Sequence, residues 1–216
     1  MTFTRAIGLG SNKIIRLIVR GLALSKIHPN VLTFLGLVIN MAAAALLAVG
    51  RFRLAGVVII GAGLFDMVDG RVARETNRVT CFGGFFDSVL DRYSDLALLV
   101  GMLVWYGSIN RPFYVVLTAI AMTGSVMVSY TRARAENTIP TCKVGFMERP
   151  ERVVLVIIGA LFLRMAQVLW VIAVLSNLTV VHRMIFTWQE TKRLEEAQLK
   201  PAGGARAATK AGSQLG

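Results

Sequence analysis

Cysteine and histidine are scarce in this sequence. Its 216 residues include two cysteines, Cys81 and Cys142, and two histidines, His28 and His182. Both cysteines fall in segments that we place on the cytoplasmic side of a membrane, where thiols stay reduced, which argues against a disulfide. Neither histidine has a partner at metal-binding spacing. A metal site in this chain would therefore depend on oxygen ligands.

Acidic residues are half as frequent as basic ones. The sequence has 12 aspartates and glutamates against 24 lysines and arginines, which gives a net charge of +12. Such an excess indicates either nucleic-acid binding or contact with anionic membranes and phosphate-bearing ligands. The basic residues are scattered over loop ends and are not gathered with stacking aromatic residues, which argues against nucleic acid. The first 28 residues lack a signal-peptide pattern, so we expect them to be retained.

Long apolar runs dominate the chain. It is 55% hydrophobic with a mean hydropathy of +0.63, and it has too few polar residues to cover a soluble globule. We predict an all-α integral membrane protein whose six transmembrane helices lie at about 30–49, 54–73, 83–106, 112–133, 150–168 and 169–188. Residues 163–167 would form the last turn. An amphipathic helix at 11–27 would lie in the membrane interface.

The distribution of basic residues predicts the orientation. The N-terminal segment, the connections after the second and fourth spans, and the tail carry the excess of lysine and arginine, so both termini should face the cytoplasm. We divide the chain into an interfacial segment (1–28), a six-helix domain (29–190) and a disordered basic tail (191–216). The small residues of 42–45 suit close helix packing, within the chain or in a homodimer.

Acidic residues interrupt two of the predicted spans. Residues 66–91 read DMVDGRVARETNRVTCFGGFFDSVLD. Helical spacing predicts one shared face on each span, formed by Asp66, Asp69, Gly70 and Ala73 and by Gly83, Asp87 and Asp91. A short turn after Arg74 would make these spans antiparallel and side by side. At a rise of about 1.5 Å per residue, all four carboxylates would then lie at one depth, roughly 12 Å inside the cytoplasmic end.

Four carboxylates at this depth cannot all stay ionised without cations. Two hard divalent ions, Mg²⁺ or Mn²⁺, would neutralise them and leave positions open for phosphate oxygens, as in two-metal phosphoryl transfer. Ion pairing with arginines is an alternative that needs no metal, and the candidates are Arg71, Arg74 and Arg92. An ion-coupled transporter is a second alternative, but the acids cluster toward one face and no inverted repeat is evident.

The order of these residues also carries a resemblance. The pattern D-x2-D-G-x2-A-R-x8-G-x3-D-x3-D, from Asp66 to Asp91, is similar to the signature of the CDP-alcohol phosphotransferases. The resemblance implies that Asp66, Asp69, Asp87 and Asp91 hold two metal ions, and that Asp91 also takes the proton of the acceptor hydroxyl. The residues implied in binding the CDP donor are Asn30, Thr33, Asp69, Gly70, Ala73, Arg74, Thr80 and Gly83. Helix capping around Pro29 is the alternative role for Asn30 and Thr33.

Basic residues in the second half indicate what accepts the transferred group. The stretch SYTRARAENTIPTCKVGFMERPERVV is rich in arginine, which an uncharged acceptor would not require but a phosphorylated one would. Topology alone accounts for some of this charge, particularly Arg134 and Lys143. The stretch resembles the phosphatidylinositol phosphate synthases and their archaeal relatives. That resemblance implies that the acceptor phosphate is bound by Arg132, Arg149, Arg152 and Arg183.

The sequence thus predicts a transferase in the cytoplasmic membrane, with its active site on the cytoplasmic side. CDP-diacylglycerol and inositol 1-phosphate would give phosphatidylinositol phosphate and CMP, and no nucleic acid would take part. Glycerol 3-phosphate is an alternative acceptor, because the same arginines could hold it. CDP-inositol is an alternative donor, although the chain has no domain that could make it.

Overall fold

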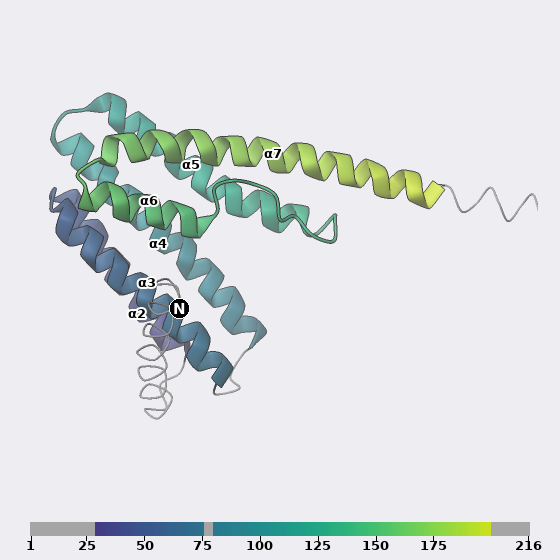
Figure 1. Ribbon diagram of the computed structural model, residues 1–216, viewed down its shortest axis with the longest axis horizontal. Coiled ribbons are helices and arrows are strands. Elements are labelled where there is room, and N and C mark those ends of the chain that lie inside the picture. Colours follow the sequence, from purple (N-terminus) through teal and green to yellow (C-terminus); the bar gives the residue numbers. More distant parts are fainter. Residues whose placement is uncertain (1–28, 76–79, 200–216) are drawn as a thin grey trace, which may run out of the picture.

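The computed structural model describes residues 29–75 and 80–199, and within them the side chains of residues 30–66 and 80–197. These residues form six α-helices and no strand, as predicted (Figure 1). The helices are α2 (Pro29–Ala48), α3 (Phe52–Glu75), α4 (Cys81–Ser108), α5 (Pro112–Ala135), α6 (Arg149–Leu161) and α7 (Met165–Leu199). The predicted interfacial helix at 11–27 lies outside the described residues.

Local sequence signals account for most of the helix ends. Helices α2 and α5 begin at prolines, which fit the first helical turn because its N–H groups have no partner there. Thr80 caps α4, since its hydroxyl oxygen accepts a hydrogen bond of 2.9 Å from the backbone N–H of Gly83. Gly50 supplies a positive φ of 78° in the turn from α2 to α3. The turn into α7 contains Leu163, within the range predicted for it.

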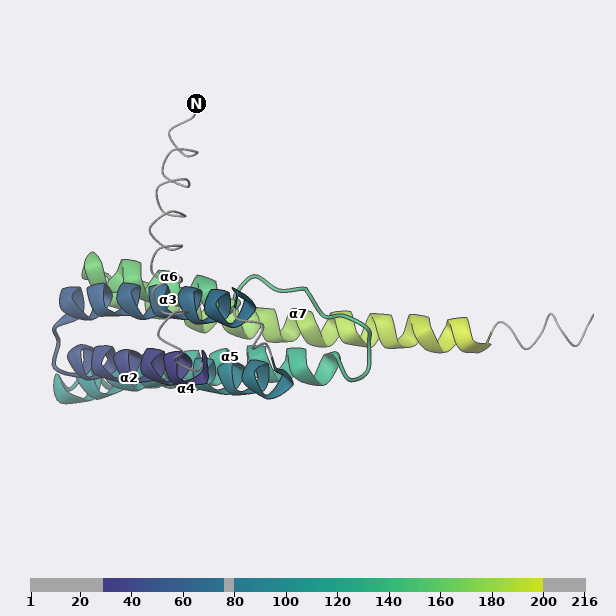
Figure 2. The same ribbon diagram turned by 90° about the horizontal axis from the view of Figure 1, so that it is seen from below.

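Helix α2 packs against both α3 and α4, which corrects the prediction that the two acidic spans lie side by side. Figure 2 shows α3 and α6 in one layer and α2, α4 and α5 in the other. Small residues allow this arrangement. A β-carbon on Gly101 of α4 would lie 2.3 Å from the carbonyl oxygen of Ala44, so the α2 backbone passes directly over this glycine.

The hydrophobic core lies at the end of the bundle away from the acidic residues. Leu47, Ile59, Met102 and Leu169 come from four different helices and are almost completely buried in one cluster. Ala43 and Ala44 belong to the same cluster, so half of the small-residue run at 42–45 packs within the chain. The core therefore fixes the helices at one end, while the polar ends of α3, α4 and α6 meet beyond it.

Large apolar side chains cover the outside of the bundle. Phe34, Val57, Val116 and Leu178 are each about half exposed, as expected for surfaces that face lipid. Within the described residues, three helices are long and apolar enough to cross a membrane, at 30–48, 112–135 and 165–197. The prediction of six full spans fits α6 poorly. This helix has only 13 residues, or about 20 Å, against a hydrocarbon thickness of about 30 Å.

Helix α7 is longer than the sixth predicted span. It continues to Leu199, so residues 191–199 are helical although the sequence analysis placed them in a disordered tail. The segment ETKRLEEAQL explains the difference, because it consists almost entirely of strong helix formers. Arg193 also pairs with Glu190 one turn earlier, at 3.6 Å. Residues 200–216 of the predicted tail lie outside the described residues.

Candidate active site

The site begins where Asp66 of α3 lies against α2. A β-carbon on Gly36 of α2 would lie only 2.8 Å from the Oδ1 atom of Asp66. Any side chain at position 36 would therefore push the carboxylate away from α2. A role for Gly36 could not be predicted, because nothing in the sequence indicates that α2 lies under the acidic face of α3.

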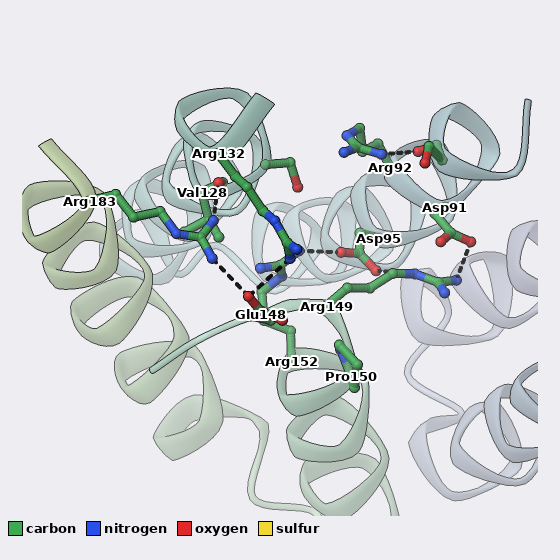
Figure 3. Close-up of a pocket in the computed structure, with 12 residues that line it drawn as sticks. Asp91, Arg92, Asp95, Val128, Arg132, Glu148, Arg149, Pro150, Arg152 and Arg183 are labelled. Atoms are coloured by element: carbon green, nitrogen blue, oxygen red, sulfur yellow. Dashed lines mark hydrogen bonds and ion pairs between the residues drawn. The ribbon is translucent and has the colours of Figure 1, made fainter. Parts of the chain in front are cut away.

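Arg149 joins the acids of α3 and α4. Its Nη2 atom lies 2.8 Å from Oδ2 of Asp66 and 2.9 Å from Oδ1 of Asp91, and its Nε lies 3.6 Å from Oδ1 of Asp95. Figure 3 shows the Arg149 side chain reaching from the start of α6 toward Asp91. Because one nitrogen contacts both carboxylates, Asp66 and Asp91 are close enough to share a single cation. Helix α6 supplies that cation, whereas the sequence analysis considered only arginines of α3 and α4 as partners.

Asp95 and Arg152 form a buried ion pair next to this cluster. Nη2 of Arg152 lies 2.7 Å from Oδ2 of Asp95, and the two side chains are 5% and 8% exposed. Nη1 of Arg152 also donates a hydrogen bond to the carbonyl oxygen of Met147. This pair ties the start of α6 to the middle of α4 and positions the adjacent Arg149.

Removing one partner of this pair should destabilise the protein strongly. We expect Asp95→Ala to leave the Arg152 charge buried and unpaired, which costs about 3–5 kcal/mol. The measurement is the midpoint of thermal unfolding of the full chain in detergent. Asp87→Ala is the matched control, because Asp87 is an acid of the same helix that is only partly buried. An equal loss of stability in both variants would contradict the assignment.

The described carboxylates meet some, but not all, of the requirements of a site for a hard divalent cation. Asp66 and Asp91 already share one cationic group, and their oxygen atoms are the ligands that Mg²⁺ and Mn²⁺ prefer. Among the side chains that the structure describes, no three acidic, cysteine or histidine groups are arranged around a common metal position. Asp69 lies on helical backbone of α3, but its side chain is outside the described part. Asp87 lies one turn before Asp91 and is partly buried.

Three of the residues implied in donor binding meet at the start of α4. A β-carbon on Gly83 would lie 3.0 Å from Oγ1 of Thr80 and 3.5 Å from Oδ1 of Asn30. The beginnings of α2 and α4 are thus adjacent, and the absence of a side chain at Gly83 keeps the space between them open. Thr33 lies one turn further along α2 and is buried. The backbones of Gly70, Ala73 and Arg74 belong to α3, and their side chains are not described.

The four arginines singled out from the sequence line one pocket. It has a volume of about 280 Å³ and opens between α4, α5, α6 and α7 (Figure 3). Its charged lining residues are Asp91, Arg92, Asp95, Arg132, Glu148, Arg149, Arg152 and Arg183. Residues from distant parts of the sequence therefore place several guanidinium groups beside Asp91. Such a pocket can bind an anion next to a carboxylate that is able to accept a proton.

These arginines differ in how firmly their side chains are held. Arg183 is 1% exposed, and its guanidinium donates hydrogen bonds to the carbonyl oxygens of Val144 and Val128. Arg152 is held by Asp95, as described above. Arg132 and Arg149 are 38% and 28% exposed and contact only carboxylates. Their side chains are therefore less enclosed than those of Arg152 and Arg183, and a bound anion could replace their carboxylate partners.

A second, mostly apolar cavity adjoins the acidic cluster. It has a volume of about 410 Å³ and is lined by residues of α2, α3, α4 and α6, among them Ile60, Leu64 and Val154. Asp66, Asp95 and Arg149 form its polar end. An amphiphilic ligand could therefore place an apolar chain between α3 and α6 and its polar group at the acids.

Comparisons with known proteins agree with this geometry. The chain is 37% identical over 170 residues to an archaetidylinositol phosphate synthase of Pyrococcus horikoshii, covering 78% of this chain and 86% of that protein. It is 34% identical over 198 residues to a phosphatidylinositol phosphate synthase of Mycobacterium tuberculosis, covering 86% of this chain and 91% of that protein.

Solved structures of the mycobacterial enzyme have the same fold. A crystal structure with CDP-DAG bound superposes with a TM-score of 0.76 at 34% identity, covering 82% of this chain and 94% of that one. A second, in complex with manganese and citrate, gives 0.75 at 35% identity, covering 81% and 88%. The family model for CDP-alcohol phosphatidyltransferases matches residues 26–189, which include all six described helices except the last part of α7. This chain therefore belongs to the CDP-alcohol phosphatidyltransferase family, whose members are membrane-bound transferases.

Proposed function

We propose that the protein transfers a phosphatidyl group from CDP-diacylglycerol to inositol 1-phosphate, giving phosphatidylinositol phosphate and CMP. The observation that carries the proposal is the pocket in which four arginines surround an aspartate of the family signature. The names of the similar proteins support it, since one is an archaetidylinositol phosphate synthase and the other a phosphatidylinositol phosphate synthase.

The donor would bind on the α2, α3 and α4 side of the acids. One apolar chain of CDP-diacylglycerol fits the cavity between α3 and α6, whose polar end is formed by Asp66 and Arg149. The cytidine part would lie toward Asn30, Thr33, Thr80 and Gly83 and along the α3 face. The residues of that face that would bind the CDP donor are Asp69, Gly70, Ala73 and Arg74. The diphosphate of the donor would then lie between the two cavities, beside Asp91.

The acceptor phosphate would bind in the arginine pocket. Arg132 and Arg149 have partly exposed side chains that contact only carboxylates, so they would contact the phosphate oxygens directly. Arg152 and Arg183 are buried and hydrogen-bonded to backbone carbonyls, so they would hold the pocket in shape and add positive charge. Nη2 of Arg183, which contacts Glu148 in the pocket, would also reach the phosphate. An acceptor held in this way presents its free hydroxyl toward Asp91, which lines the same pocket.

Asp91 would act as the general base. It accepts the proton of the acceptor hydroxyl as that oxygen bonds to the lipid-side phosphorus and the phosphorus–oxygen bond to CMP breaks. CMP leaves with the electrons of that bond. Two divalent ions, Mg²⁺ or Mn²⁺, held by Asp66, Asp69, Asp87 and Asp91, would supply neutralisation of the diphosphate charge. Positioning of the two substrates by the chain would contribute most of the remaining rate enhancement.

The orientation in the membrane follows from the same site. The pocket lies near the polar ends of α4, α5 and α6, and the connection between α5 and α6 carries several basic residues. Water-soluble acceptors would reach it from the cytoplasm, so we place this side and both termini there.

The proposal is tested by comparing acceptors. Purified protein with CDP-diacylglycerol and Mg²⁺ should release CMP at least about tenfold faster with inositol 1-phosphate than with free inositol or serine, since a charged hydrogen bond contributes about 1.5–3 kcal/mol. CMP is quantified by chromatography, and omission of the protein is the blank. Equal rates with free inositol would refute a role for the arginines in acceptor binding.

Glycerol 3-phosphate is the second candidate acceptor. It carries the same phosphate group, so the partly exposed side chains of Arg132 and Arg149 suit it as well. Faster CMP release with glycerol 3-phosphate than with inositol 1-phosphate would assign the protein to phosphatidylglycerophosphate synthesis. Repeating the assay with a CDP-activated archaeal ether lipid would decide between diacyl and archaeal donors.

A further inference from the structure

Glu148 lies at the centre of the arginine pocket and is bound by two of its arginines. Its Oε1 atom lies 3.2 Å from Nη1 of Arg132 and 2.9 Å from Nη2 of Arg183. Figure 3 shows the carboxylate between these two side chains, which reach it from α5 and α7. A single carboxylate oxygen thus receives a charge-assisted hydrogen bond from each side of the pocket.

The position of Glu148 in the chain does not explain this orientation. Glu148 immediately precedes α6 and is its N-cap residue, but its side chain makes no capping hydrogen bond to the helix. Glutamate is also not among the residues favoured at an N-cap. The side chain is 40% exposed. Its contacts are therefore those of an anion bound by arginines, and the helix does not depend on them.

Most of the remaining nitrogens of the two arginines are also hydrogen-bonded. Nε and Nη1 of Arg183 donate to the carbonyl oxygens of Val144 and Val128, so only its Nη2 is directed into the pocket. Nε of Arg132 donates to Glu136 at 3.0 Å. The one guanidinium nitrogen that Arg183 directs into the pocket thus binds the carboxylate of Glu148, and Nη1 of Arg132 binds the same oxygen.

We propose that Glu148 is a specificity-determining residue that fills the anion position of the pocket until the phosphate of the acceptor displaces it. The proposal rests on the proposed function, because it assumes that the acceptor carries a phosphate. Arg132 and Arg183 then exchange one carboxylate oxygen for phosphate oxygens, and the exposed Glu148 side chain turns toward solvent. Its neighbour Arg149, which contacts Asp66 and Asp91 in the structure, would have to turn from these acids to reach the same phosphate.

This arrangement selects for charged acceptors. A phosphate dianion replaces both ion pairs of Glu148 with contacts to a higher charge, so the exchange is favourable. An uncharged polyol offers nothing to Arg132 and Arg183 in place of the carboxylate. It must bind beside Glu148 or leave two cations without a partner, and both are unfavourable.

The test is the affinity of the full-length protein for inorganic phosphate. We expect Glu148→Gln to bind phosphate about five- to tenfold more tightly in calorimetric titrations, because the competing charge of two partly exposed ion pairs is removed. In the transfer assay the KM for inositol 1-phosphate should fall while kcat changes little, and the preference over free inositol should narrow. The matched control is Glu151→Gln, an exposed acid of the same helix that does not line the pocket. It should change neither quantity.

Glu148→Asp provides a second, conservative variant if the glutamine variant does not fold. Its shorter side chain withdraws the carboxylate from the arginines, so phosphate should again bind more tightly. Unchanged or weaker phosphate binding in a folded variant would overturn the proposal. Unchanged binding would mean that Glu148 does not compete with anions, and weaker binding would mean that it orients the arginines for them. Phosphate titrations require no turnover. A shift in phosphate affinity without CMP release from any acceptor would therefore refute the proposed function, while the competition between Glu148 and phosphate would still hold.

Discussion

Asp91→Asn is expected to reduce CMP release by about 10²–10⁴-fold, the contribution typical of a general base. The side chain of Asp91 is 22% exposed and lines the arginine pocket, so its carboxylate faces the position of the acceptor. Asparagine has nearly the same shape but cannot accept the proton of a hydroxyl. Binding of CDP-diacylglycerol in the presence of Mg²⁺ should largely survive, because the cavity between α3 and α6 and the other three aspartates are unchanged. Single-turnover CMP release and equilibrium binding of the donor measure the two effects separately.

Glu151→Gln is a suitable control for this prediction too. It makes the same change from carboxylate to amide on an exposed side chain near the pocket, and its rate should equal that of the unmodified protein. Full activity of Asp91→Asn would remove the base assignment. Loss of donor binding together with activity would instead make Asp91 chiefly a residue of the donor site.

The helices could be predicted from the sequence because their signals are local. Apolar runs of membrane length, prolines at helix starts and the short polar turns fix the six elements within a few residues of their observed ends. One of the two larger differences also has a local cause, because the helix formers after Glu190 extend α7. The other does not, since α6 ends at Leu161 in a turn where Leu163 adopts a positive φ of 58° that leucine does not favour.

The arrangement of the helices, and hence the site, was only partly predictable. The spacing of Asp66 and Asp91 correctly placed two carboxylates near each other, but periodicity within one helix cannot show that α2 packs between their helices. For the same reason, neither the role of Gly36 nor the contact of Arg149 with the acids was predicted. Arg149 and Glu148 are neighbours in the chain that bind opposite charges, and only the fold shows which groups each one meets.

Arg149→Gln is expected to have two opposite effects. In the structure its guanidinium occupies the space between Asp66 and Asp91, at 2.8 and 2.9 Å, and so competes with any other cation for these oxygens. Removing it should tighten Mn²⁺ binding by about tenfold, the effect of about 1.4 kcal/mol of lost competition. At the same time kcat/KM for inositol 1-phosphate should fall by about 10- to 150-fold, since a hydrogen bond between charged groups contributes about 1.5–3 kcal/mol. Mn²⁺ binding is measured by paramagnetic resonance without substrates, and transfer by CMP release.

Arg164→Gln is the matched control, because Arg164 is exposed in the turn at the other end of α6, about 20 Å away along the helix. It should alter neither Mn²⁺ binding nor transfer. If Arg149→Gln weakens Mn²⁺ binding, the arginine holds the carboxylates in position and does not compete for them. If it tightens Mn²⁺ binding but transfer is unchanged, Arg149 balances the acidic cluster and takes no part in binding the acceptor. The proposed role of Arg149 has two parts. It neutralises the acids when no metal is bound, and it turns to the acceptor phosphate when metal takes its place. Only tighter metal binding together with slower transfer fits both parts.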